Sequence, residues 1–153
     1  MSKQPRLYKS KLIPVYKAPG KTNVTFTVGH SGTYLIYEDK KLVYVGYSSN
    51  NMYRTCMRHF NKWSDTDKLA AFFGFKAGVT YYGNDMSRYK VRFIFCTAER
   101  AAKLEKSLII KYNPRDNTEK YKSYTPTPEA VELVNEFETA RITNFDDMEE
   151  APF

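Results

Sequence analysis

Cysteine is scarce in this chain of 153 residues. The two present, Cys56 and Cys96, belong to no Cys-x-x-Cys pair and to no cluster of cysteine and histidine. A structural zinc site needs four such ligands at close spacing, so we exclude one. Two cysteines allow one disulfide at most, and nothing in the sequence supports it.

Long hydrophobic runs are absent as well. No stretch of about 18 apolar residues occurs, and the first residues, Met-Ser-Lys-Gln-Pro-Arg, are polar rather than leader-like. We therefore expect an intracellular, cytoplasmic protein with no membrane partner, in a reducing compartment. The length predicts one domain with a real hydrophobic core.

Acidic residues are rare outside the C-terminal part of the chain. Residues 124–153 hold 8 of the 17 acids and one of the 24 bases, Arg141. Residues 1–123 therefore carry 23 bases and 9 acids, a balance of +14, whereas the whole chain has a net charge of +7. Residues 1–123 are basic enough to attract polyanions, and the 13 tyrosines of the whole chain suit contacts with nucleic acid. Charge alone is equally consistent with a solvated surface.

The hydrophobic pattern predicts strands alternating with helices. Residues 33–37 and 42–47 are β-branched and aromatic runs joined by a polar turn, which predicts a hairpin. Thr97 is placed to cap a helix over residues 98–112, and Pro114 stops that helix. The other predicted elements are strands over residues 24–28, 79–82 and 88–95, and helices from the Ser48-Ser49-Asn50-Asn51 caps to Phe60, over 69–75, and from 128 to about 139.

This order of elements gives an α/β (α+β) class with a small, mainly antiparallel sheet. Residues 1–23 are basic and rich in proline, and we expect an arm that lies along the domain or along a nucleic acid. Residues 24–123 form the main domain. Residues 124–153 form a C-terminal helix followed by an acidic tail.

Glu105 is the most unusual residue of the 98–112 helix. It lies four residues after Ala101 and three before Leu108, which places it toward the apolar face. A carboxylate there is costly unless it is paired or bound to a cation. It either bridges to a lysine such as Lys103 or Lys106, or it is a ligand for Mg²⁺ or Mn²⁺, which prefer oxygen.

Two tyrosines of the predicted hairpin and a basic helix face are the other candidates. Tyr34 and Tyr44 lie near Gly32 and Gly46, and we interpret these glycines as room for a phosphate backbone at the sheet edge. Tyrosine in a strand also packs in the core. On the next helix, Arg54 and Arg58 lie four residues apart with His59 beside them. They form either an exposed basic face or a fork that binds a scissile phosphate.

These residues together resemble the GIY-YIG endonuclease family. The resemblance spans residues 32–117 and consists of Gly32-Thr33-Tyr34, Tyr44-Val45-Gly46, Arg54 eight residues later, and Glu105 followed by Leu108-Ile109-Ile110 and Tyr112-Asn113-Pro114 up to Asn117. It implies that residues 24–123 are a stand-alone nuclease domain with a small, mainly antiparallel three-stranded sheet flanked by helices. It also implies hydrolysis of DNA phosphodiester bonds with one Mg²⁺ or Mn²⁺ ion in each active site.

The resemblance assigns a role to each matching residue. Glu105 would hold the metal ion, Tyr34 with Tyr44 would activate the attacking water, and Arg54 would stabilise the phosphate. Asn117 would support the site by hydrogen bonding, as would Arg58 and His59.

The chain departs from the family pattern at two places. Thr33 replaces isoleucine or valine, with its side chain expected to face away from Tyr34. His59 lies five residues past Arg54, where many members place histidine three or four past, and Arg58 occupies the nearer position.

DNA is the expected partner, with double strands favoured and single-stranded or branched DNA also suitable, bound by a monomer or a homodimer. We expect the residues that contact it to be Arg58, Lys62, Lys76 and Arg88. The alternative function is a non-catalytic DNA- or RNA-binding module, because residues 89–95 alternate polar and aromatic side chains somewhat as an RNA-recognition strand does.

Overall fold

A five-stranded antiparallel sheet is the centre of the fold. The computed structural model describes residues 6–61, 79–117, 121 and 124–143. Strands β5 (Gly32–Glu38), β6 (Lys41–Ser48) and β7 (Tyr89–Phe95) form its main part, with β5 in the middle. Two short strands, β1 (Tyr8–Lys9) and β2 (Ile13–Pro14), pair with the outer side of β7. The expected three-stranded sheet is therefore wrong in its strand count, because the N-terminal segment extends it.

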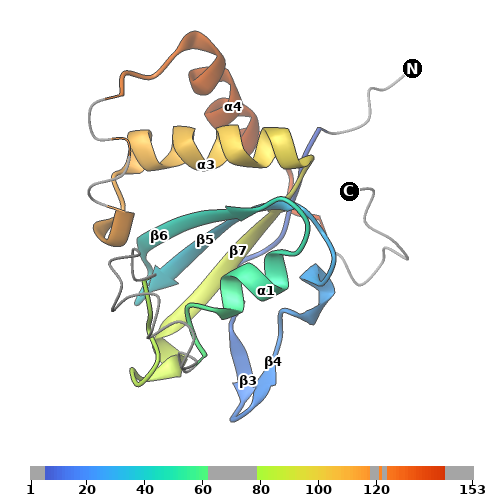
Figure 1. The fold of residues 1–153 in the computed structure, drawn as a ribbon, viewed down its shortest axis with the longest axis vertical. Coiled ribbons are helices and arrows are strands. Elements are labelled where there is room, and N and C mark those ends of the chain that lie inside the picture. Colours follow the sequence, from blue (N-terminus) through green and yellow to red (C-terminus); the bar gives the residue numbers. More distant parts are fainter. Residues whose placement is uncertain (1–5, 62–78, 118–120, 122–123, 144–153) are drawn as a thin grey trace, which may run out of the picture.

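Helices cover both faces of this sheet, which confirms the mixed α/β class (Figure 1). The short helix α1 (Met52–Met57) lies on one face and α3 (Ala98–Tyr112) on the other. Helix α4 (Pro128–Thr139) packs against α3 on the side away from the sheet. None of the helices in the described residues combines the length and the apolar composition that a membrane span requires.

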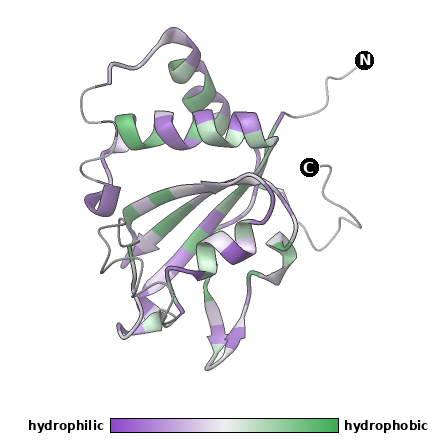
Figure 2. Ribbon diagram, in the orientation of Figure 1, coloured by the Kyte–Doolittle hydropathy of each residue, from purple (hydrophilic) through white to green (hydrophobic). Residues whose placement is uncertain are grey.

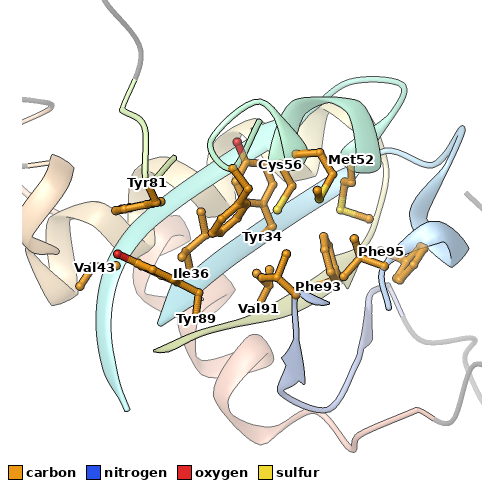
Figure 3. Packing of buried hydrophobic residues seen from close by; sticks show 14 residues of the cluster. Tyr34, Ile36, Val43, Met52, Cys56, Tyr81, Tyr89, Val91, Phe93 and Phe95 are labelled. Carbon is orange, nitrogen blue, oxygen red and sulfur yellow. The ribbon is translucent and has the colours of Figure 1, made fainter. Parts of the chain in front are cut away.

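The sheet separates two hydrophobic cores. Between the sheet and α1 lie Tyr34, Phe93, Met52 and Cys56, which Figure 3 shows packed together. The second core lies between the sheet, α3 and α4 and contains Cys96. The two cysteines are buried free thiols in different cores, so they form no disulfide. Burial raises the pKa of Cys96 to about 12, so this thiol is unreactive at neutral pH.

Local capping explains why the long helices have the predicted bounds. The Thr97 side chain accepts from the Arg100 amide at the start of α3, and Asn113 ends the helix in the left-handed conformation, directly before Pro114. Thr127 caps α4 in the same way. The predicted 88–95 strand begins one residue later, since Arg88 belongs to the 3₁₀ turn η2 (Met86–Arg88).

Three predicted elements differ from the structure. The strand over 24–28 is wrong: η1 (Thr25–Thr27) is a 3₁₀ turn, closed by the Thr27 hydroxyl on the Val24 carbonyl. The strand over 79–82 is also wrong, because Tyr81 begins a turn. The helix expected to reach Phe60 ends at Met57. The helix predicted over 69–75 and the acidic tail from residue 144 lie outside the described residues.

The segment expected to be an arm lies along the domain. After β1 and β2 it forms a separate two-stranded hairpin, β3 (Tyr16–Ala18) and β4 (Lys21–Thr22), below α1 in Figure 1. Lys9 of β1 is largely buried and donates to the Phe137 carbonyl at 3.0 Å, which joins this strand to the end of α4.

Candidate active site

The two motif tyrosines lie on neighbouring strands and on the same face of the sheet. Tyr34 on β5 is paired with Gly46 on β6, and the Tyr34 ring lies over that glycine. A Cβ at position 46 would be 2.4 Å from the Tyr34 hydroxyl oxygen. At Gly32 a Cβ would be 2.0 Å from the Ile94 carbonyl oxygen. Both glycines therefore make room for protein atoms, which corrects the interpretation that they make room for a phosphate backbone.

Tyr34 and His59 form a hydrogen bond inside this core. The Tyr34 hydroxyl oxygen is 3.0 Å from His59 Nε2, and His59 Nδ1 is 2.6 Å from the Val79 carbonyl oxygen. Because a carbonyl only accepts, Nδ1 carries the proton of the neutral ring and donates it. Nε2 is therefore the acceptor, and the Tyr34 hydroxyl donates to it.

Tyr44 completes a group of three rings. Its ring centre lies 4.5 Å from that of His59 and 6.3 Å from that of Tyr34. His59 reaches the tyrosines because α1 ends at Met57 and the next turn is tight: the His59 amide donates to Cys56 three residues back. This tight turn brings His59 to the tyrosines although it lies five residues past Arg54, so His59 belongs to the tyrosine group.

Burial controls the protonation of this group. Tyr34 is 1% exposed and His59 7% exposed. Burial raises the pKa of Tyr34 well above its usual range, with further contributions from Tyr44, Cys56 and Glu105, while Arg58 lowers it. Burial also lowers the pKa of His59, and the positive charge of Arg58 lowers this pKa further. The resting state at neutral pH is therefore a neutral phenol donating to a neutral imidazole.

Glu105 is buried on α3, on the opposite side of the sheet from the tyrosine rings. Its side chain is 1% exposed, in agreement with its predicted position toward the apolar face. Both α1 and α3 contact the edge strand β6, and the charge of Glu105 acts on Tyr34. The charge of Glu105 therefore reaches Tyr34 across the sheet.

Lys103 and Lys106, the two lysines named as alternative partners of Glu105, contact other residues. Lys103 forms ion pairs with Glu99 and Glu129, and Lys106 lies over the rings of Tyr121 and Tyr124. Thr33 faces this layer, as expected, and donates to the Ala101 carbonyl at 2.9 Å, one helical turn before Glu105.

The arginines of α1 lie at the surface. Arg54 is exposed, and within the described part of the chain its guanidinium makes no hydrogen bond or ion pair. Arg58 is also exposed at the end of the helix, and its charge acts on both Tyr34 and His59. Of the two, Arg58 is the one that the structure connects to the tyrosine group.

Asn117 supports the strand that carries Tyr44. From the 3₁₀ turn η3 (Arg115–Asn117) its side-chain amide accepts from the Val45 amide at 2.8 Å and donates to the Val45 carbonyl at 3.2 Å. These two bonds replace those that a further strand would make to the edge of β6. Asn117 therefore positions the backbone on either side of Val45, at Tyr44 and Gly46.

Tyr81 is a neighbour of the site that the sequence pattern did not indicate. Its amide donates to the His59 carbonyl at 2.6 Å, and its hydroxyl donates to an Asp116 oxygen at 2.7 Å. Its ring is buried and lies 5.6 Å from that of Phe60. Residues 79–82 have the composition of a strand, so the sequence predicted a strand there rather than a turn beside the site.

Arg88, one of the predicted DNA contacts, is not brought to the tyrosines. Arg88 pairs with Asp39 and Glu38 at the far end of β5, about 13 Å along the strand from Tyr34. Lys62 and Lys76 lie outside the described residues.

Glu105 is the residue to which the sequence pattern assigned a metal ion. Across residues 6–61, 79–117, 121 and 124–143 no group of three or more metal-binding side chains exists. A single carboxylate fits Mg²⁺ or Mn²⁺, which take their other ligands from water and substrate phosphate.

Comparison of the chain with models of known protein families, with curated proteins and with solved structures finds no match.

Proposed function

We propose that this protein is a divalent-metal-dependent endonuclease that hydrolyses DNA phosphodiester bonds by a one-metal, GIY-YIG-type mechanism. The observation that carries the proposal is the hydrogen bond from the Tyr34 hydroxyl to His59 Nε2, with the Tyr44 ring 4.5 Å from the imidazole. A phenol whose proton already points at a neutral, oriented imidazole is arranged for proton transfer.

The raised pKa of Tyr34 keeps its phenol protonated at neutral pH, so almost no phenolate is present to act as a base. His59 removes this difficulty, because its Nε2 takes the Tyr34 proton as the phenol oxygen takes one from the attacking water. The water oxygen then bonds to phosphorus, and the bond to the leaving 3′ oxygen breaks. That oxygen takes a proton from solvent. The Val79 carbonyl stabilises the imidazolium formed, since it keeps its hydrogen bond to Nδ1.

Glu105 would hold the Mg²⁺ or Mn²⁺ ion. When bound, the ion polarises the scissile phosphate and neutralises charge on the leaving oxygen. Arg54, exposed on α1, is available for a phosphate oxygen.

The distribution of charge supports DNA as the substrate. On the side of the sheet that carries α1 and the tyrosine rings lie the exposed bases Lys17, Lys21, Arg54 and Arg58, and described residues 13–37 contain no acid. Helix α4 on the opposite side contains four glutamates and no base. A polyanion is therefore attracted to the side of the molecule that carries α1 and the tyrosine rings.

A cleavage assay tests the proposal. Supercoiled plasmid is incubated with the protein in Mg²⁺, Mn²⁺ or EDTA, beside Glu105→Ala, Arg54→Ala and the control Arg100→Ala, whose arginine pairs with Glu136 on the acidic side. We expect metal-dependent cleavage, reduced about 100-fold or more in the first two variants and unchanged in the control. Glu105→Ala should bind DNA as well as the wild type or better, because an acid has been removed.

A second candidate function is a nucleic-acid-binding module without catalysis. It is favoured by the burial of Tyr34 and Glu105, each 1% exposed and on opposite sides of the sheet, which is more closed than the solvent-open pocket a nuclease site requires. Plasmid retarded in a gel but never cut, in either metal, would establish this function and refute the nuclease.

A further inference from the structure

The outer part of the β3–β4 hairpin, residues 17–21, contributes nothing to the hydrophobic cores. It projects from the body of the protein in Figure 1, and its residues from Lys17 to Lys21 are all exposed. Pro19 and Gly20 form the turn, with Gly20 at φ 74°, the composition and geometry of a type II turn. No atom lies within 4 Å of where a Gly20 Cβ would be, so the tip is surrounded by solvent.

The base of the hairpin is held firmly by the core. Val15 and Val24, on either side of it, are fully buried in the same core as Tyr34. The Asn23 amide donates to the Val15 carbonyl at 3.0 Å, and the Asn23 side chain donates to the Pro14 carbonyl at 2.8 Å. The hairpin is thus an exposed ribbon on a rigid base.

The hairpin stands beside α1. Tyr16 packs on the core next to the α1 residues Tyr53 and Cys56, and burial together with these two neighbours raises the pKa of Tyr16. Exposed Arg54 and Arg58 lie on the same helix. The hairpin contributes Lys17 and Lys21, on either side of the turn, and its outer half is hydrophilic in Figure 2. The exposed bases of the hairpin and of α1 therefore lie on the same side of the sheet as the tyrosine group.

We propose that the β3–β4 hairpin enters the major groove of duplex DNA while Lys17 and Lys21 contact the phosphates on either side. The groove of B-form DNA is about 12 Å wide and admits a two-stranded ribbon. The small tip residues Ala18, Pro19 and Gly20 let the backbone approach the base edges. This inference rests on the proposed function only in taking DNA as the substrate.

Binding measured in EDTA tests the hairpin separately from cleavage. Fluorescence anisotropy with a labelled DNA duplex compares the wild type, Lys17→Ala/Lys21→Ala and the control Lys40→Gly/Lys41→Ala. The control removes two exposed lysines from the β5–β6 turn, and glycine suits the φ of 70° at position 40. We expect the hairpin variant to bind about tenfold more weakly, with a salt slope smaller by about two. The control should change by less than about twofold.

Duplex RNA and single-stranded DNA of the same length give the second comparison. The major groove of A-form RNA is too narrow for a ribbon, so the hairpin variant should lose less than about threefold affinity for RNA. An equal loss for duplex DNA, duplex RNA and single strands would overturn the groove assignment. So would a hairpin variant that binds duplex DNA like the control, whatever the cleavage assay shows. A protein that never cuts DNA but loses duplex affinity through the hairpin variant would refute the nuclease and support the hairpin.

Discussion

The Tyr34 ring lies so close to the backbone of Gly46 that position 46 has no room for a Cβ, which would be 2.4 Å from the Tyr34 hydroxyl oxygen and 2.9 Å from a ring carbon. The glycine on one strand and the tyrosine on the next are therefore a single structural unit. The hydrogen bond between Tyr34 and His59 depends on the Tyr34 ring staying in this position.

Gly46→Ala should destabilise the protein by about 3 kcal/mol, because the new methyl group displaces the buried Tyr34 ring. Gly20→Ala is the control. A methyl group at position 20 meets open space, so the only expected cost is strain of the left-handed backbone at φ 74°, about 1 kcal/mol. Urea unfolding of both variants measures the difference. Equal losses in the two would show that the ring does not fill position 46.

Tyr34→Phe should cost about 1–3 kcal/mol, since it leaves His59 Nε2 buried without its donor. Tyr82→Phe changes an exposed phenol and should cost less than about 0.5 kcal/mol. Thermal unfolding of each variant is the measurement. A Tyr34→Phe protein as stable as the wild type would mean that the two side chains do not bond.

Stability should fall as the pH drops below 6.5. The pKa of folded His59 is lower than its ordinary value of 6.5, so below that pH the unfolded chain binds more protons than the folded one. Paired carboxylates such as Glu38 have a lowered pKa and lose their contribution only at more acid pH. Unfolding free energies between pH 7.5 and 5.5 should show this decline for the wild type and much less of it for His59→Gln. A parallel decline in both would assign it to other groups.

Mg²⁺ should raise the melting temperature through Glu105. At free ion concentrations of about 100 times Kd, binding adds about 2.7 kcal/mol to the unfolding free energy. Glu105→Gln keeps the shape of the buried side chain but removes its charge, so its melting temperature should not respond to the ion. The readout is independent of cleavage. A matching response in the variant would place the ion elsewhere.

Asn117→Asp should lower both stability and activity. The carboxylate loses the donor to the Val45 carbonyl and places a charge beside it, at a cost of about 1–3 kcal/mol. Asn61 is exposed, and Asn61→Asp is the matched control. Denaturant unfolding and plasmid cleavage are measured together. Unchanged cleavage in Asn117→Asp would separate this amide from the tyrosine group.

The elements with local signals were predictable from the sequence. Helix α3 has the predicted bounds because Thr97 and Pro114 mark its ends within the chain itself. The β5–β6 hairpin consists of two β-branched and aromatic runs joined by a polar turn. Residues 24–28 have strand composition, but the Thr27 hydroxyl closes a turn on Val24, and no window of sequence reveals that bond.

The candidate site was predictable as a set of residues but not as an arrangement. The burial of Glu105 follows from helical periodicity alone. The role of Gly46 does not, since it depends on the register that places Tyr34 opposite it. His59 was ambiguous because helical spacing assumes that α1 continues, whereas the helix ends at Met57 and a tight turn directs the ring inward.

An electric dipole runs through the sheet in the described part of this small protein. Its positive end is made by Lys17, Lys21, Arg54 and Arg58 on the α1 side, whereas three of the four glutamates of α4 on the other side pair with bases of α3. A long polyanion exerts a torque on such a dipole before any contact forms. Productive collisions with the polymer should therefore be more frequent than random tumbling allows, and added salt should remove that advantage.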